Sequence, residues 1–419
     1  MSFSDSLRGE RSPGEPARQE SEESASSVHP PPVKHTRRKI ITGAIAAGSL
    51  LALGTGGYLD LAANWQRLTL PPLTTTDLGA INALVWSPDG KYIALAKTPE
   101  TVILSDLTYT DVGTYGLQVW DADGSRLRMS HQTDDVIGSL SWSPDSKWLA
   151  APVGNRVQIL AGSGAGGKDG TPPVAQIAGV TSLPEGEDTS NRNVAAWSPD
   201  GTRLAFSHFG VSKKTGQATG VLSLWDFSRH QVLWQTTQQG NWFWTLSWSP
   251  DSQHLALSSE DEPRWIGVVD ARNGQAILDL GPEQEMNPHE LASSVWSPDG
   301  RFIAIGYTLT GDGSRGKVSI RDAHTGRQVT AYFVEGARDN GPMITMVAWS
   351  PDSRYLAVIG NMDRIRGWDL TTDTLAFTCP PAPGTGMHTQ PTSVLAWSPN
   401  GKHLVSAVDG TYIRIWDVP

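Results

Sequence analysis

The glycine-rich stretch from Gly162 to Asp169 is the part of this chain that most nearly matches a nucleotide-binding loop. A phosphate-binding loop needs Ser or Thr after its lysine to hold magnesium, and a helix that aims its amide groups at the ligand. Here Asp169 follows Lys168, and its carboxylate would repel phosphate. The residues that come next, Gly170 to Pro173, cannot begin a long helix. We therefore interpret the stretch as a loop between two strands.

Residue types that serve as metal ligands or nucleophiles show no productive spacing. The ten histidines have no metal-ligand pattern, and neither a His-Glu-x-x-His nor a Gly-x-Ser-x-Gly motif is present. A single cysteine, Cys379, allows no internal disulfide and no cysteine-rich metal site. We therefore predict no cofactor, no metal and no catalytic residue within a local motif. A site assembled from several distant repeats remains an alternative.

Composition narrows the class of partner. The formal net charge is -10, whereas a nucleic-acid-binding domain needs a basic surface to replace counterions, so we expect no nucleic acid partner. The chain holds 17 Trp and 43 Gly, which is typical of short strands joined by tight turns.

The first 64 residues divide into three segments. Residues 1–33 are polar and are predicted to be disordered. Residues 34–58 combine a basic cluster with an uncharged apolar run, and the Arg37–Arg38 pair resembles a twin-arginine export signal or anchor. A short linker, residues 59–64, follows. The positive-inside rule then places the remainder on the extracytoplasmic side of a membrane; a buried core helix and a cytoplasmic ring are the alternatives, and cleavage of the segment stays open.

The strongest signal is a motif, Trp-Ser-Pro-Asp/Asn-Gly/Ser, that occurs seven times at intervals of 48 to 56 residues. The motifs begin at Trp86, Trp142, Trp197, Trp248, Trp296, Trp349 and Trp397. Each lies between two short apolar runs and predicts a tight hairpin turn, because Pro presets φ and Gly or Ser follows at the bend. The tryptophans themselves are predicted to pack between repeats.

Further strands follow each hairpin, and most third strands end in Asp, as in Val119-Trp120-Asp121. These Trp-Asp endings and four-strand repeats resemble WD-repeat β-propellers, and the Trp-Ser-Pro turns also resemble those of the periplasmic Tol-system propeller. The resemblance covers residues 65–419 and implies an all-β, seven-bladed propeller. The segment Trp65 to Leu70 is predicted to supply the fourth strand of the last blade, which would close the ring and remove an open edge.

Candidate partner-binding residues lie in the segments that lead into first strands, where WD-repeat propellers usually bind partners. Aromatic and Arg side chains are common interface anchors. The candidates are Arg192, Trp242, Trp244, His289, Arg338 and His388. Trp242 and Trp244 flank Phe243, and either could instead point into the blade. Three long connections between second and third strands, roughly 97–116, 208–220 and 308–316, are expected at the opposite face of the ring.

These observations favour a membrane-targeted, extracytoplasmic propeller that binds a protein or peptide partner as a scaffold, with a monomeric ring. The alternative is a propeller enzyme or small-ligand sensor with a site at the channel mouth. Fold analogy alone supplies only a weak expectation of function.

Overall fold

The computed structural model describes only part of the chain, and the described residues form strands, turns and irregular connections, without a helix. The described residues are 81–103, 109–112, 114–154, 156–162, 175–177, 188–189, 193–211, 218–239, 243–259, 265–281, 286–309, 315–334, 344–360, 364–379, 394–408 and 412–418. Within these ranges no helix has the length and apolarity that a bilayer crossing demands. The predicted signal segment, residues 34–58, lies outside them, as does the predicted closing strand from Trp65 to Leu70.

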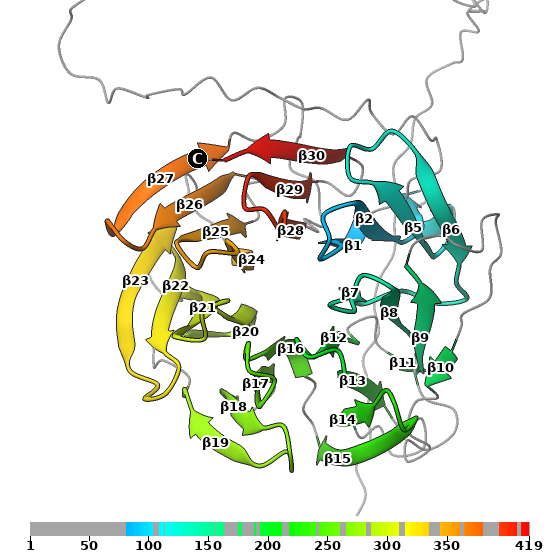
Figure 1. Ribbon diagram of the computed structural model, residues 1–419, viewed down its shortest axis with the longest axis horizontal. Coiled ribbons are helices and arrows are strands. Elements are labelled where there is room, and N and C mark those ends of the chain that lie inside the picture. The colour runs from blue at the N-terminus through cyan, green and yellow to red at the C-terminus, as the bar shows by residue number, and fades with distance from the viewer. Residues whose placement is uncertain are drawn as a thin grey trace, which may run out of the picture. The chain divides into compact units, whose positions relative to one another are not determined.

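Seven antiparallel sheets are arranged as blades around one axis, which confirms the predicted all-β propeller (Figure 1). Blade 1 consists of β1 Ile81–Trp86, β2 Tyr92–Lys97, β5 Gly116–Asp121 and β6 Leu127–Gln132. A separate hairpin, β3 Glu100–Ile103 with β4 Tyr109–Val112, lies between β2 and β5 in the chain. Blade 2 consists of β7 Ser141–Trp142, β8 Trp148–Val153, β9 Arg156–Ala161 and β10 Ala175–Ile177.

Blades 3 and 4 continue the same meander. Blade 3 consists of β11 Asp188–Thr189, β12 Ala195–Trp197, β13 Arg203–Val211, β14 Ala218–Asp226 and β15 Gln231–Gln239. Both β11 and β12 pair with β13. Blade 4 consists of β16 Phe243–Trp248, β17 His254–Ser259, β18 Ile266–Asp270 and β19 Ala276–Asp279.

The last three blades complete the ring. Blade 5 consists of β20 Met286–Trp296, β21 Phe302–Leu309, β22 Arg315–Asp322 and β23 Gln328–Val334. Blade 6 consists of β24 Ile344–Trp349, β25 Tyr355–Gly360, β26 Ile365–Asp369 and β27 Thr374–Cys379. Blade 7 has three described strands, β28 Val394–Trp397, β29 His403–Val408 and β30 Tyr412–Asp417.

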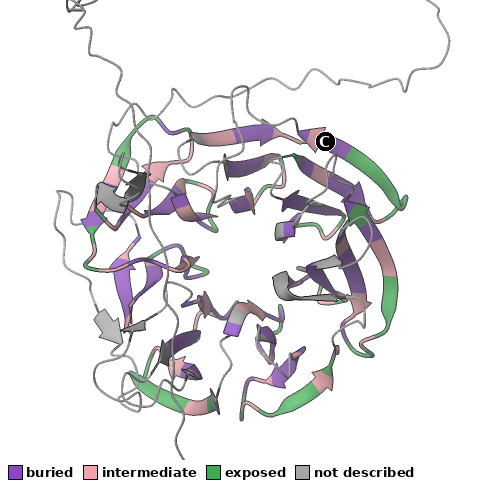
Figure 2. Cartoon of the chain, turned by 180° about the vertical axis from the view of Figure 1, so that it is seen from behind, coloured by how far each residue is buried: buried purple, intermediate pink, exposed green. Residues whose placement is uncertain are grey.

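Burial follows the position of a strand within its blade. Second strands are packed on both faces by the neighbouring blades, so they read as continuous apolar runs; Ile93 to Ala96 of β2 are all at most 2% exposed. Outer strands keep one face in solvent, and β23 accordingly mixes buried Tyr332 with exposed Phe333. Figure 2 shows this change from buried inner strands to outer strands in which exposed and buried segments are mixed.

The first and last blades pack directly against each other. Ile81, Leu84 and Leu95 of blade 1 share one buried cluster with Val394 and Val405 of blade 7. Apolar packing between the two ends of the repeat array therefore closes the ring among the described residues.

The long connections do not lie where the sequence analysis placed them. The start of β1 (Ile81) pairs with the end of β2 (Lys97), and Lys97 also pairs with Gly116 at the start of β5. Connections that lead into a first strand and connections between second and third strands thus share one end of the ring, which we call the lead-in face. The expectation of opposite faces was wrong, because every second connection of an antiparallel meander returns to the same side.

Two of those connections are also shorter than expected. In blade 3, β13 and β14 extend to Val211 and Ala218, so most of 208–220 is paired strand. In blade 5, pairing continues to Leu309 and Arg315. The extra residues lengthen the strands, because extending a ladder satisfies backbone groups that a loop would leave to solvent.

Candidate functional site

The end of the ring opposite the lead-in face, which we call the turn face, carries the seven Trp-Ser-Pro turns. In blade 1, Ser87 Oγ donates to Asp89 Oδ1 at 2.7 Å and accepts a hydrogen bond from Tyr92 N at 2.9 Å. Gly90 closes the turn with φ of 72°, a conformation that favours glycine. The motif therefore satisfies its own backbone groups, which explains the choice of Ser, Asp and Gly.

The last position of the turn alternates between neighbouring blades. Blades 1, 3, 5 and 7 carry Gly, whereas blades 2, 4 and 6 carry Ser146, Ser252 and Ser353 with φ of 59°, 60° and 61°. Each of these serine Oγ atoms accepts a hydrogen bond from the turn aspartate of the preceding blade. The pairs are Asp89 N to Ser146 at 3.0 Å, Asp200 N to Ser252 at 3.0 Å and Asp299 N to Ser353 at 2.9 Å. The turn face is thereby joined in blade pairs 1–2, 3–4 and 5–6.

The tips of the turns are exposed and carry paired charges. Lys91 Nζ lies 3.1 Å from Asp89 Oδ2, and Lys147 Nζ lies 3.0 Å from Asp145 Oδ2. The hydroxyl of Ser143 holds the pKa of Asp145 below its usual range. Exposed pairs of this kind contribute little to stability. The turn face thus repeats one polar pattern, with its carboxylates committed to turn geometry.

The seven motif tryptophans lie in the hydrophobic clusters between adjacent blades. All but Trp86 are buried to at least nine-tenths. Three of their indole Nε1 atoms donate to a carbonyl of the preceding blade. These bonds join Trp248 to Ala196 at 2.9 Å, Trp349 to Val295 at 3.2 Å and Trp397 to Ala348 at 3.0 Å.

Six of the seven third strands end in an aspartate that faces the start of the second strand, whereas β9 of blade 2 ends in Ala161. In blade 6, Asp369 is 4% exposed and accepts hydrogen bonds from Arg354 at 2.9 and 2.7 Å and from Thr371. The Arg354 guanidinium, together with Thr371, holds the pKa of Asp369 well below its usual range. In blade 1, the Arg128 guanidinium donates two hydrogen bonds to the Asp121 carboxylate, at 2.6 and 2.9 Å. These carboxylates fix strand ends and are engaged inside the blade.

Two of the six predicted partner-binding residues, Trp244 and His289, lie on described strands. Arg192, Trp242, Arg338 and His388 fall outside the described residues. Trp244 is the second residue of β16, and His289 lies in the first half of the long strand β20. Phe243, which stands between Trp242 and Trp244 in the chain, is buried at 3% exposure.

Trp244 occupies a recurrent irregularity of the inner strands. Pairing of β16 with β17 shifts between Phe243 and Thr245, so Trp244 is the extra residue of a bulge. Shifts at the corresponding place leave Asn82 and Thr345 unpaired in β1 and β24. A bulge turns the strand locally and re-aims its side chains, which makes this end of the inner strands suited to blade-specific contacts.

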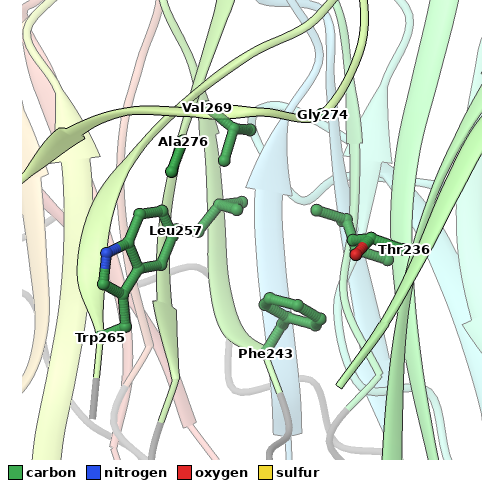
Figure 3. A pocket seen from close by; sticks show the side chains of 8 residues that line it. Thr236, Phe243, Leu257, Trp265, Val269, Gly274 and Ala276 are labelled. Atoms are coloured by element: carbon green, nitrogen blue, oxygen red, sulfur yellow. The ribbon is translucent and has the colours of Figure 1, made fainter. Parts of the chain in front are cut away.

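A cavity of about 320 Å³ lies at the boundary between blades 3 and 4 (Figure 3). Phe243 and Leu257, which are 3% and 1% exposed, belong to its wall. Trp265, Val269 and Thr236 complete most of the described lining. The sequence analysis did not select this place. Its one local signal is Val269 before Asp270, where blade 1 has Trp120 before Asp121, and blade 5 also departs from Trp at this position.

Two buried titratable groups, His208 and Cys379, lie apart from the ion pairs at the turns and strand ends. His208 on β13 is 4% exposed, neither ring nitrogen has a hydrogen-bond partner, and burial lowers its pKa to about 4. Burial raises the pKa of Cys379 to about 12, which keeps the thiol protonated and unreactive. Among the described residues, no three His, Cys, Asp or Glu side chains come together as metal ligands.

Comparisons with known families match parts of the chain to WD-repeat models. The model described as "WD domain, G-beta repeat" matches residues 124–171 and 386–417. The model of the anaphase-promoting complex subunit 4 WD40 domain matches residues 246–349.

Similar proteins share low identity with this chain. Actin-interacting protein 1 of Drosophila melanogaster is 22% identical over 228 residues, which cover 54% of this chain and 33% of that protein. WD repeat-containing protein 1 of Mus musculus is 23% identical over 45% of this chain and 35% of that protein. The chain thus matches about a third of the length of these relatives.

Among solved structures, hydrazine synthase of Kuenenia stuttgartiensis superposes with a TM-score of 0.61 at 15% identity, covering 83% of this chain and 97% of that chain. This likeness concerns the fold alone. WD-repeat propellers generally bind protein partners. The family matches and the ring of seven blades together show that the chain is built from WD40 repeats and forms a seven-bladed β-propeller.

Proposed function

We propose that this protein is a membrane-targeted, extracytoplasmic WD-repeat propeller that serves as a protein-binding scaffold. The observation that carries the proposal is the contrast between the two ends of the ring. The turn face repeats one motif whose serines and aspartates are engaged within and between turns. The lead-in face differs from blade to blade in connection length, strand length and bulges, and recognition depends on such blade-specific chemistry.

The relatives support a protein as the class of partner. The Drosophila protein is named for an interaction with actin, and it matches this chain over a third of its own length at 22% identity. At that identity we carry over the class of partner and not actin itself. Candidate contacts on this chain are Arg192, Trp242, Trp244, His289, Arg338 and His388.

The binding experiment uses the full chain and two triple variants. Trp242→Ala, His289→Ala and Arg338→Ala alter the lead-in segments. Lys91→Ala, Lys147→Ala and Lys402→Ala alter exposed residues of the turn face as a matched control. Cross-linked partners are identified for each form, and their dissociation constants are then measured with purified components. We expect the first variant alone to lose the partner, at unchanged melting temperature.

Two other outcomes would contradict the proposal. Loss of the partner with the lysine variant alone would move recognition to the turn face. Absence of any partner with a measurable dissociation constant for the parent chain would argue against a scaffold.

Membrane targeting rests on residues 34–58, where Arg37 and Arg38 precede an uncharged run from Ile40 to Tyr58. Replacing both arginines by lysine keeps the positive charge but removes the arginine pair that a twin-arginine signal requires. Arg37→Lys with Arg38→Lys is therefore expected to leave the chain in the cytoplasmic fraction, protected from protease added outside the membrane. A parent chain and variant that fractionate identically would contradict export by this route.

A further inference from the structure

The cavity between blades 3 and 4 reaches from the core to the surface. Phe243 and Leu257 form buried parts of its wall, Trp265 and Thr236 are half-buried, and Ala276 is exposed. Figure 3 shows Thr236 facing Trp265, Leu257 and Phe243 across the space. A small molecule can thus reach the cavity along its exposed side.

The corresponding place between blades 5 and 6 is filled by two aromatic rings. Tyr332 of β23 stacks on Trp368 of β26, with ring centroids 5.1 Å apart and planes inclined by 16°. Tyr332 Oη also donates to Asp373 Oδ1 at 2.8 Å. The Tyr332 phenol, the Trp368 indole and the Asp373 carboxylate together fill the space between blades 5 and 6.

Strand register identifies the equivalents between blades 3 and 4. In blade 3, Thr236 of the outer strand pairs with Leu222, which stands four residues before the aspartate that ends the third strand. In blade 5, Tyr332 pairs with Val318, which stands at the same distance from its own closing aspartate. Thr236 and Tyr332 are therefore equivalent positions.

Val269 and Trp368 each directly precede the closing aspartate of their blade. Gly274 and Asp373 each come four residues after it, with φ of 71° and 55°. Thr236, Val269 and Gly274 all line the cavity, so it occupies the place of the stacked aromatic pair. The Trp234 indole lies over Gly274, on the side where Asp373 stands in blade 6, and donates to the Ala271 carbonyl at 2.9 Å.

Other boundaries carry at least one large side chain at these two positions. The pairs, read from the same registers, are His131 with Leu160, Leu280 with Arg321, and Cys379 with Trp416. His131 also shares a hydrogen bond of 2.9 Å with Gln158. The pair Thr236 with Val269 is therefore the exception among these boundaries.

We propose that the cavity between blades 3 and 4 binds a free planar aromatic molecule of phenol or indole size. The ligand takes the space that Tyr332 and Trp368 fill between blades 5 and 6, lies among Phe243, Trp265 and Leu257, and meets the Thr236 hydroxyl.

Three observations favour this class of ligand. The lining side chains are apolar apart from the Thr236 hydroxyl and the Trp265 indole N–H, so they suit an apolar ring that carries one polar group. The volume of about 320 Å³ falls in the range of small-molecule sites. Aromatic walls also favour stacked or edge-on rings over aliphatic groups.

This site is independent of the proposed scaffold function, because it lies between blades and includes none of the candidate partner-binding residues. Its test therefore needs no protein partner.

The experiment measures binding of indole and of p-cresol to the full chain by calorimetry and ligand-observed NMR, with cyclohexanol as an aliphatic probe. We expect saturable binding of both aromatic probes with a dissociation constant of about 1 mM or tighter. Cyclohexanol is expected to bind at least about tenfold more weakly.

Two variants fill the cavity from opposite walls. Val269→Trp restores the Trp-Asp ending of blade 4, and Thr236→Tyr restores the phenol of the outer strand. Each is expected to weaken indole binding at least about tenfold while leaving the melting temperature unchanged or higher. Thr237→Tyr is the matched control, since Thr237 is the exposed neighbour of Thr236 in β15 and should retain binding.

Several results would overturn the proposal. These are no saturable binding of either aromatic probe, equal binding of cyclohexanol, or undiminished indole binding in either filling variant that remains folded. Binding of N-acetyltryptophanamide without binding of indole would replace the free molecule with an aromatic side chain of a partner.

Discussion

Tyr332 and Trp368 lie on different blades, yet their rings stack at 5.1 Å and Tyr332 also donates to Asp373. Burial, together with the hydrogen bond to Asp373, raises the pKa of Tyr332 above its usual range, so the phenol stays protonated. Tyr332, on the fourth strand of blade 5, thus contacts both the third strand of blade 6 and the turn that follows it. The contact joins a fourth-strand position of one repeat to a third-strand position of the next.

We predict that Trp368→Val destabilises the protein by about 3 to 5 kcal/mol, since it removes a buried ring and leaves a cavity. Tyr332→Phe keeps the stacking and loses one hydrogen bond, at a cost of about 1 kcal/mol. Urea unfolding at neutral pH measures both. Phe333→Ala, at a half-exposed neighbour in β23, should change stability by less than about 0.5 kcal/mol; equal effects of all three would contradict the assignment.

His208 makes stability depend on acid. Its pKa falls to about 4 in the folded state because of burial, against about 6.5 when unfolded. Between these values only the unfolded chain binds the proton, so stability is complete above about pH 6.5 and decreases by about 3 kcal/mol as the pH falls to about 4.

Replacing His208 by Leu should remove this part of the acid sensitivity. It should also leave stability at pH 7 equal or higher, since both ring nitrogens lack partners. Urea unfolding of parent and variant at pH 7 and pH 4.5 gives the comparison, with His324→Ala as an exposed control. An identical pH dependence of parent and His208→Leu would refute the prediction.

The aspartates that end third strands should differ in importance. Asp369 is almost fully buried against Arg354, whereas Asp121 is more exposed against Arg128. Asp369→Asn is therefore expected to lower the melting temperature at pH 7 by several degrees, and Asp121→Asn by less.

The sign of the pH effect follows from the lowered pKa of Asp369. A depressed carboxyl pKa adds stability above the unfolded value of about 3.9, and that stability is lost as the pH falls through the folded value. The difference between parent and Asp369→Asn should shrink as the pH is lowered from 5 to 2. A constant difference across this range would speak against the carboxylate charge as its cause.

The serines at positive φ offer a test of the paired turns. Ser252→Ala keeps a side chain at φ of 60° and loses the acceptor for Asp200 N, so we expect a cost of about 1 kcal/mol. Ser252→Gly loses the same bond but relieves the backbone, and its effect should be smaller. Urea midpoints rank the three proteins. A ranking with alanine more stable than glycine would contradict the strain argument.

Local chemistry made much of the fold predictable from the sequence. Each Trp-Ser-Pro turn satisfies its own backbone within a few residues, so seven copies indicated seven hairpins, and their spacing indicated four-stranded blades. The missing Trp of blade 4 was also visible as Val269. The signal pair Arg37–Arg38 and four of the six candidate partner residues lie outside the described residues and stay predictions.

Tertiary structure decided what happens between blades. Thr236 and Val269 line one cavity, and Tyr332 stacks on Trp368, because the packing of neighbouring twisted sheets brings these strands together. The connections that lead into first strands and those between second and third strands lie at the same end of the ring. This placement likewise follows from antiparallel pairing rather than from residue type. A sequence motif encodes contacts within a few residues. The hollow boundary between blades 3 and 4 arises from two small side chains, 33 residues apart, that only the closed ring brings together.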